Sequence, residues 1–324
     1  MAETLPEGVV IDAVAIGRNE GARLIRCLDS LIAAGFRHIV YVDSGSTDDS
    51  IAQARARKIA VVELDMTQPF TAARARNAGV AALPGQADLI QFIDGDCELM
   101  PGWLPLAAQF LIDNASVAVA CGRRREIRPE ASIYNRLIDR EWDTPAGQTR
   151  SCGGDALMRA QAFAAVGGFD PSLIAGEEPE LCVRLRAEGW QIWRLDAEMT
   201  RHDAAITRFG QWWRRTRRAG HAYAEGAALH GAAPESHNVA PLRRALLWGF
   251  ALPLAAILGA LLIHPILLAL LLAWPAQIAR LTWRDGDPAR AAFLTLGKIP
   301  EALGAVDYGW KRLTGGKTRL IEYK

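Results

Sequence analysis

The chain has 324 residues, and its 37 lysines and arginines almost balance 36 aspartates and glutamates, which leaves a formal net charge of +1. This balance disfavours a nucleic-acid binder that relies on overall positive charge, while the length suits one catalytic domain with an appendage. The five cysteines include no CxxC pair, which indicates reduced, buried thiols rather than a zinc site. Residues 1–10 lack a basic-then-apolar signal region, so secretion is not expected.

Short β-rich runs alternate with amphipathic helical stretches up to about residue 111. The runs cover residues 9–16, 38–42, 59–64 and 89–93. This alternation predicts βαβ units and a mainly parallel sheet, in which ligands bind beyond the carboxyl ends of the strands. Residues 117–196 predict mixed α and β structure with more loop. There Gly153, Gly154 and Gly176 indicate tight turns or close backbone approach to a ligand.

The predicted strand at residues 89–93 runs directly into Asp94, Gly95 and Asp96. Because side chains alternate along a strand, the two carboxylates can face the same side, and Gly95 lets a ligand approach the backbone. Mg²⁺ and Mn²⁺ prefer oxygen ligands and often complete their shell with substrate phosphate. The segment therefore predicts a metal site at Asp94 and Asp96, although a DxD alone also occurs in loops by chance.

A second polar segment follows the predicted strand at residues 38–42. Asp43 at the end of that strand overlooks the predicted cleft and can accept hydrogen bonds from a base or a ribose. Ser46 or Thr47 is expected to cap the helix that follows. Acidic residues such as those at positions 48 and 49 are favoured in a first helical turn by the helix dipole alone.

With these segments the chain resembles family 2 glycosyltransferases. Their GT-A fold is an α/β fold in which a Rossmann-like mixed sheet flanked by helices joins an acceptor-binding half. The resemblance covers roughly residues 9–223 and is carried by four motifs in the family's order: AIGRNE at 15–20, VDSGSTD at 42–48, ARNAG at 75–79 and DGD at 94–96. It implies that the donor nucleotide-sugar is bound by Asn19, Glu20, Asp43, Arg76 and Asp94. It also implies that Mg²⁺ or Mn²⁺ is held at the DGD motif.

Residues 175–181 (AGEEPEL) resemble the family's acidic motif, usually a Glu-Asp pair whose second member is the general base. Glu178 occupies that second position, so the resemblance implies that Glu178 deprotonates the acceptor. A helix N-terminus explains the same residues, because acids are favoured there and Pro179 suits a first turn. Both interpretations can hold together.

Two further segments resemble parts of the family. Residues 201–203 match a region where some relatives supply a metal ligand or phosphate contact, so His202 is a candidate third ligand, although a lone histidine is more often structural. Residues 211–215 (QWWRR) resemble the QxxRW motif of processive synthases, but Arg215 stands where tryptophan is expected, which disfavours processive polymerisation. The arginines of residues 214–218 suit either a phosphate site or a basic helix at a lipid surface.

The composition changes at Pro241. Residues 245–263 and 266–276 carry no acidic or basic charge at neutral pH, and His264 and Pro265 separate them. A bilayer span needs about 20 apolar residues, and arginines flank both outer ends, which predicts a membrane-associated helical hairpin with both ends cytoplasmic. The alternatives are a buried helical pair of a soluble domain and a re-entrant or interfacial element.

The predicted organisation has three parts. A GT-A catalytic domain covers residues 1–230, with a nucleotide-sugar-binding half at 1–115 and an acceptor-binding half at 116–230. The apolar hairpin covers residues 241–284, and a cytoplasmic or interfacial tail covers residues 285–324.

The predicted function is inverting, metal-dependent transfer of a sugar from a nucleoside-diphosphate sugar to a polyprenyl-diphosphate-linked saccharide. The expected location is the cytoplasmic side of the inner membrane, in polysaccharide biosynthesis, with no nucleic-acid partner. The alternatives are sugar transfer to polyprenyl phosphate and a catalytically silent scaffold that binds nucleotide-sugar. No GxGxxG follows the first strand, which disfavours a dinucleotide oxidoreductase, and no glycine-rich loop suggests a nucleotidyltransferase.

Overall fold

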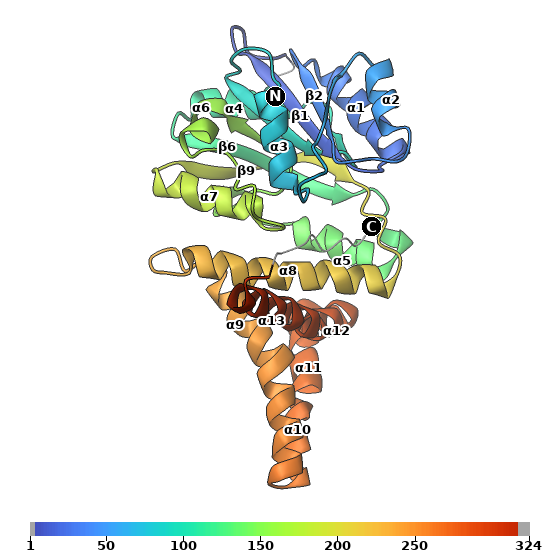
Figure 1. Cartoon of the computed structure of the whole chain (residues 1–324), viewed down its shortest axis with the longest axis vertical. Coiled ribbons are helices and arrows are strands. Elements are labelled where there is room, and N and C mark those ends of the chain that lie inside the picture. The colour runs from blue at the N-terminus through green and yellow to red at the C-terminus, as the bar shows by residue number, and fades with distance from the viewer. Residues whose placement is uncertain (1–3, 317–324) are drawn as a thin grey trace. The chain divides into compact units, whose positions relative to one another are not determined.

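The computed structural model describes residues 4–316, and the chain divides after Ala205 into two compact units (Figure 1). The four strands predicted in the first third are confirmed as β1 (Ile11–Gly17), β2 (Ile39–Asp43), β3 (Ala60–Glu63) and β4 (Leu89–Asp94). The remaining strands of the first unit are β5 (Cys97–Leu99), β6 (Val117–Glu126), β7 (Gly147–Thr149), β8 (Ala156–Arg159) and β9 (Gln191–His202). All five cysteines are buried free thiols, as expected.

The strands of the first unit form a single mixed sheet. Over the described residues its order is β3-β2-β1-β4-β8-β6-β9-β5, with β7 paired to β9. The β1, β2, β3 and β4 strands run parallel to one another, whereas β8 runs antiparallel to β4. The helices that flank the sheet are α1 (Ala22–Ala34), α2 (Ser50–Ala56), α3 (Ala72–Ala81), α4 (Trp103–Asp113), α5 (Ile133–Trp142), α6 (Ala160–Ala165) and α7 (Glu177–Ala187). The expected α/β architecture is therefore confirmed.

The strand register gathers polar residues at one edge of this sheet. Gly17 pairs with Asp43, and Ile16 pairs with Asp94, so the carboxyl ends of β2, β1 and β4 lie in one row. The α3 helix lies close on this part of the sheet because Gly79 has no side chain. A Cβ there would overlap Val14 of β1.

The second unit is helical. It contains α8 (Phe209–His230), α9 (Val239–Leu246), a π-helical segment η2 (Leu247–Ala251), α10 (Leu252–Leu262), a 3₁₀ segment η3 (Pro265–Leu272), α11 (Ala273–Asp285), α12 (Pro288–Leu296) and α13 (Lys298–Thr314). The predicted tail is thus largely helical, and residues 317–324 lie outside the described residues. The domain boundaries given above stay predictions; the structure groups α8 with the second unit.

Two continuous helical stretches in the second unit, Val239–Leu262 and Pro265–Asp285, are long and apolar enough to cross a membrane. The break between them confirms the interruption predicted at His264 and Pro265. In the most apolar 18 residues of each stretch, only 17% of the first and 6% of the second is buried. This exposure disfavours the alternative of a buried helical pair in a soluble core.

Helices α8 and α13 cross at backbone contact, because each presents a glycine to the other. A Cβ on Gly220 would overlap the carbonyl oxygen of Glu301, and one on Gly304 would overlap the carbonyl oxygen of Arg217. The crossing therefore has no room for a methyl group, and a larger residue at either glycine would force the two backbones apart.

We expect Gly304→Ala to destabilise the second unit by roughly 1–3 kcal/mol, the usual cost of overpacking. Thermal unfolding of the full-length protein in detergent measures this as a lower Tm. The matched control is Gly309→Ala in the same helix, where a Cβ meets nothing within 4 Å. That substitution should hold or raise Tm, because alanine favours a helix over glycine by about 1 kcal/mol. Equal Tm values for both variants would contradict the tight crossing.

Candidate active site

Asp94, the last residue of β4, is the centre of a dense polar cluster. Its Oδ1 accepts a hydrogen bond from Arg76 Nη2 at 2.8 Å, and its backbone N–H donates to Asp155 Oδ1 at 2.9 Å. Asp155 is fully buried, and its other oxygen accepts from Thr200 Oγ1 of β9 at 2.8 Å. The end of β4 is thus fixed from both sides, while the Asp94 side chain keeps 28% of its surface exposed and available to a ligand.

Arg76 of α3 links β4 to the first turn of α7. Its Nη1 donates to Glu177 Oε1 at 2.9 Å, and its Nη2 lies 3.3 Å from Glu178 Oε1. Burial alone would lower the pKa of Arg76, but the carboxylates of Asp94, Glu178 and Glu177 outweigh it and raise the pKa, so the guanidinium stays charged. The structure therefore brings Asp94, Arg76 and Glu178 together.

Glu178 has the titration expected of a base that works near neutral pH. Burial, with a further contribution from the neighbouring charge of Glu177, raises its pKa to about 7, although Arg76 opposes this. The helix N-terminus offered as an alternative explanation of these acidic residues is present, since α7 begins at Glu177 and its N-cap, Gly176, has a left-handed φ of 80°. A carboxylate with this pKa can accept a proton and later lose it to solvent.

This pKa predicts the pH dependence of turnover. A base must be deprotonated to act, so we expect the turnover rate to fall as pH falls through about 7. An ordinary glutamate would sustain the rate down to about pH 4.3. The measurement is the initial rate of nucleoside diphosphate release across a pH series at saturating donor and metal. A flat profile from neutral pH down to about 5 would contradict it.

Gly154 lies where the three site residues meet. A Cβ built there would lie 2.6 Å from Arg76 Nη2, 2.8 Å from Asp94 Oδ2 and 3.0 Å from Glu178 Oε1. The absence of a side chain at this position thus leaves the space in which these groups converge. The glycine pair flagged in the sequence marks the loop that makes this possible.

We expect Gly154→Ala to reduce turnover by about a hundredfold, because a displacement of about 1 Å in a reacting group can cost that much. Steady-state rates and Tm are measured on the same preparation. Gly210→Ala is the control, since a Cβ at Gly210 meets nothing within 4 Å, and it should leave the rate unchanged. A normal rate for Gly154→Ala would show that the space is not needed for the reaction.

Asp96 lies next to His202 beside this cluster, because β5 and β9 are neighbours in the sheet. Asp96 Oδ2 lies 3.4 Å from His202 Nε2, and His202 Nδ1 lies 3.0 Å from Glu126 Oε2. The Glu126 contact favours the tautomer with the proton on Nδ1, which turns the Nε2 lone pair toward Asp96. Burial and the charge of Arg124 lower the pKa of His202, so the ring is neutral, the form that binds metals.

The guanidinium of Arg124 lies between the two carboxylates of the DGD motif. Its Nη2 is 3.5 Å from Asp94 Oδ2 and 3.9 Å from Asp96 Oδ1, and its Nη1 is 3.7 Å from Asp155 Oδ2. Ligand atoms of Asp96, Cys97 and His202 lie within 4.8 Å of one another, and so do those of Asp94, Cys97 and Asp155. The carboxylates of this cluster thus already attract one cationic group, the guanidinium of Arg124.

The donor types in this cluster fit a hard divalent cation. Burial raises the pKa of the Cys97 thiol well above its ordinary value, so the thiol is protonated and is a poor ligand. Carboxylate oxygens and the neutral imidazole remain, and these suit Mg²⁺ or Mn²⁺. The predicted metal ligands are thus divided between two neighbouring groups that share Cys97: Asp96 and His202 lie in one and Asp94 in the other. The guanidinium of Arg124 lies near both aspartates.

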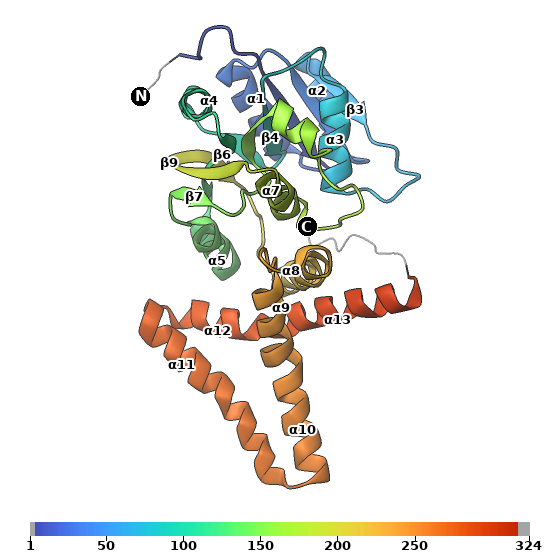
Figure 2. The same ribbon diagram turned by 90° about the vertical axis from the view of Figure 1, so that its left-hand side faces the viewer.

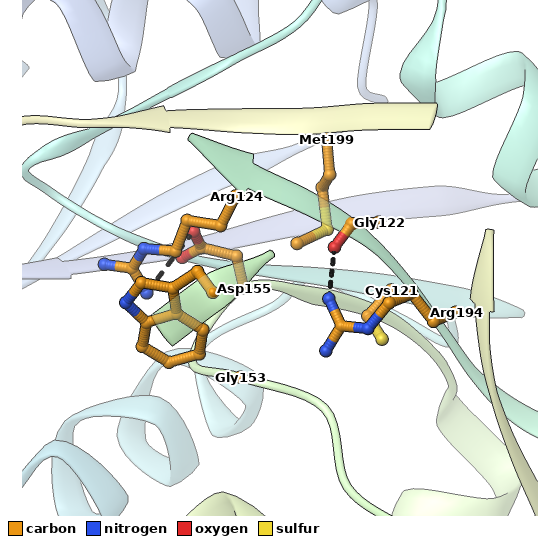
Figure 3. Close-up of a pocket in the computed structure, with 8 residues that line it drawn as sticks. Cys121, Gly122, Arg124, Gly153, Asp155, Arg194 and Met199 are labelled. Atoms are coloured by element: carbon orange, nitrogen blue, oxygen red, sulfur yellow. Dashed lines mark hydrogen bonds and ion pairs between the residues drawn. The ribbon is translucent and has the colours of Figure 1, made fainter. Parts of the chain in front are cut away.

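A small hollow adjoins this cluster (Figure 3). Its walls are Cys121, Gly122, Arg124, Trp142, Gly153, Asp155, Arg194 and Met199. Figure 3 shows Arg124 beside Asp155 on one side and Arg194 on the other, where Arg194 Nη1 donates to the Gly122 carbonyl at 2.7 Å. The guanidinium of Arg124 also lies over the Trp142 ring, 4.9 Å from its centre.

Asp43 holds its own loop. Its Oδ2 accepts from the backbone N–H groups of Gly45 and Ser46 at 2.9 and 2.7 Å, and its Oδ1 accepts from the Tyr41 hydroxyl at 2.9 Å. Asp43 is 1% exposed. A donor could therefore touch its side chain only if the turn at Gly45 and Ser46 moved to expose it. Its predicted nucleoside contact stays a prediction.

Asn19 joins the loops that follow β1 and β2. Its backbone N–H donates to Ser46 Oγ at 2.9 Å, and its Oδ1 accepts from the Thr47 N–H at 2.7 Å. The cap predicted at Ser46 or Thr47 is wrong, because these residues bind Asn19 instead and α2 begins only at Ser50. Glu20, the next residue, pairs with Arg23 at 2.8 Å.

Sequence reasoning missed three residues that hold the site: Arg124, Glu126 and Asp155. Glu126 and Arg124 come from β6, whose arginine-rich end carries no family motif. Asp155 directly follows the flagged glycine pair, so that pair was the signal that could have led to it.

Both the sequence and the fold have known relatives. Residues 14–166 match the family described as Glycosyl transferase family 2. The succinoglycan biosynthesis protein ExoA of Rhizobium meliloti (strain 1021) is 30% identical over 172 residues, which cover 49% of this chain and 51% of ExoA. The chain thus aligns with about half the length of this curated relative.

A solved structure has a similar fold over almost the whole chain. The mannosyltransferase PcManGT from Pyrobaculum calidifontis, in complex with GDP-Man and Mn²⁺, superposes with a TM-score of 0.66 at 20% identity, covering 95% of this chain and 91% of that one. This similarity supports the expected GT-A type of fold. Residues 14–166 match the model of glycosyl transferase family 2, in agreement with the resemblance found in the sequence.

Proposed function

We propose that the chain is an inverting, metal-dependent glycosyltransferase that transfers a sugar from a nucleoside-diphosphate sugar to a lipid-linked saccharide. The observation that carries this proposal is the convergence of Asp94, Arg76 and Glu178 around Gly154. We assign Asp94 and Arg76 to the leaving diphosphate and Glu178 to the acceptor, and the proximity of the three residues supports this assignment.

The donor is assigned to the carboxyl ends of β1, β2 and β4. Asp43 and Asp94 end strands separated by one other strand, so they lie about 10 Å apart, which suits a nucleoside at one and a diphosphate at the other. Asn19, Glu20 and Arg76 complete the proposed donor site. The complex of PcManGT with GDP-Man and Mn²⁺ supports a nucleotide-sugar donor and a divalent ion for the same fold.

Asp94, Asp96 and His202 would hold the divalent ion, Mg²⁺ or Mn²⁺, with Glu126 orienting the histidine ring. When bound, such an ion supplies Lewis-acid stabilisation of negative charge on a leaving diphosphate. The charge of Arg76, fixed beside Asp94, adds to this stabilisation from the protein side.

Glu178 accepts the proton of the acceptor hydroxyl as its oxygen attacks the anomeric carbon. The new bond forms between that oxygen and the carbon, while the bond from the carbon to the diphosphate oxygen breaks with its electron pair. A single displacement of this kind inverts the configuration. The raised pKa of Glu178, about 7, supports its assignment as the base.

The acceptor and the location are inferred from the second unit. Two exposed apolar helices support membrane association, and the name of the relative ExoA supports polysaccharide biosynthesis. A membrane hairpin would be superfluous for a soluble acceptor, so we assign a polyprenyl-diphosphate-linked saccharide. Arginines at both outer ends of the hairpin support the proposed location of the catalytic unit, the cytoplasmic side of the inner membrane.

A donor screen tests the proposal. Full-length protein in detergent is offered UDP-, GDP- and dTDP-sugars with and without Mn²⁺, and nucleoside diphosphate release is measured. We expect one donor class to turn over, and only with the metal. An acceptor panel then separates lipid-linked saccharides from polyprenyl phosphate. Binding of a donor without turnover of any would favour a silent scaffold instead.

A further inference from the structure

Helix α13 carries an apolar face that is exposed in the part of the chain that the structure describes. Leu303, Val306, Trp310 and Leu313 are 44%, 43%, 66% and 85% exposed. Their spacing of three or four residues puts them on one side of the helix. We call these four residues the α13 face.

The other side of α13 is already used for packing. Glu301, Gly304 and Ala305 are buried, and the contact at Gly304 fixes this side against α8. The α13 face therefore cannot turn inward to lose its exposure. An exposed stripe of this size and regularity indicates a surface that another apolar phase covers.

The position of α13 within the second unit indicates what covers the α13 face. The helix begins at the root of the apolar hairpin, where Gly249 of η2 meets the carbonyl oxygen of Lys298. The returning arm, α11, leads through α12 into the same helix. Figure 2 shows α12 and α13 lying across the root of the hairpin, while α10 and α11 extend away from them. A bilayer that takes the hairpin must have its surface at this root.

We propose that the α13 face lies in the headgroup–acyl boundary of the bilayer into which the hairpin inserts. This inference rests on the membrane association in the proposed function. Tryptophan and leucine are favoured at that boundary, where a helix lies in the plane of the surface with its apolar side about 5–10 Å deep. The α13 helix thus fixes how deeply the second unit sits in the membrane.

The cysteine distribution makes a site-specific test practical. All five native cysteines are buried, so a cysteine introduced on the surface reacts selectively with a thiol probe. Leu313→Cys reports on the α13 face. Arg312→Cys is the matched control, because it is exposed and neighbours Leu313 but points about 100° away around the helix. Ile257→Cys, at an exposed position of α10, reports separately on the hairpin.

Each full-length variant is labelled with the fluorophore NBD and reconstituted into phosphatidylcholine vesicles with and without phosphatidylglycerol. Lipids that carry a nitroxide near the headgroup or deep in the acyl chain serve as quenchers. We expect blue-shifted emission at positions 313 and 257, with shallow quenching at 313 and deep quenching at 257. Position 312 should emit as in water.

The outcomes separate this inference from the proposed function. Deep quenching at 257 with a water-like spectrum at 313 would overturn the α13 assignment and leave the membrane hairpin standing. A water-like spectrum at 257 would overturn membrane insertion itself. A blue shift at 313 that no lipid nitroxide quenches would assign the face to a second copy of the chain, again overturning the inference.

Discussion

We expect Glu178→Gln to lower the turnover rate by about a hundred- to ten-thousandfold, the range typical of a general base. The amide has nearly the same shape but cannot accept the acceptor proton. Donor binding should persist, since the donor-binding residues assigned above stay in place. The measurements are the initial rate of nucleoside diphosphate release and calorimetric titration of the donor into the same preparation.

The control is Glu188→Gln, the same substitution at the C-terminal end of the same helix, which should keep the wild-type rate. A Glu178→Gln variant that turns over within a few-fold of the wild type would refute the assigned base. Loss of donor affinity together with rate would instead show that Glu178 acts on donor binding.

The second large effect is expected for Asp96→Asn. This change removes one negative charge from the cluster and replaces a carboxylate oxygen that lies 3.4 Å from His202 Nε2. Replacing residues that merely orient a ligand typically costs about 10–100-fold in metal affinity, so loss of a ligand itself should cost more. Titration of Mn²⁺ followed by its electron paramagnetic resonance signal measures the affinity without depending on activity.

Two comparisons calibrate that result. Asp113→Asn, an exposed carboxylate at the end of α4, should leave Mn²⁺ affinity unchanged. The Mn²⁺ affinity of Glu126→Gln should lie between those of the other two variants, with a loss of about 10–100-fold, because the change weakens the contact that orients the His202 ring. Wild-type affinity in Asp96→Asn would mean that the ion is held elsewhere.

The sequence predicted the first four strands well because they are short, apolar and separated by amphipathic helices. Each predicted strand agrees with β1 to β4 within about two residues, which is typical where hydrophobic periodicity is strong. The break of the apolar hairpin at His264 and Pro265 was predicted for a similarly local reason, since proline lacks an N–H to continue a helix.

The rest of the site could not be predicted because it depends on contacts between distant parts of the chain. Arg124 reaches the DGD motif only because β6 lies two strands from β4, and Glu126 reaches His202 only because β6 and β9 pair. No local pattern reports such pairing. The cap predicted at Ser46 or Thr47 failed for the same reason, since Asn19, 27 positions from Ser46, binds that loop instead.

Arg76 has a consequence for how variants of this protein will behave. Its guanidinium contacts both Asp94, which ends β4, and the first turn of α7, and so fixes their positions relative to each other. The proposed donor site and the proposed base therefore contact the same cation, and a substitution that moves Arg76 is expected to affect both. Any evolutionary or engineered change of donor preference near Asp94 has to preserve this shared charge or rebuild both ends at once.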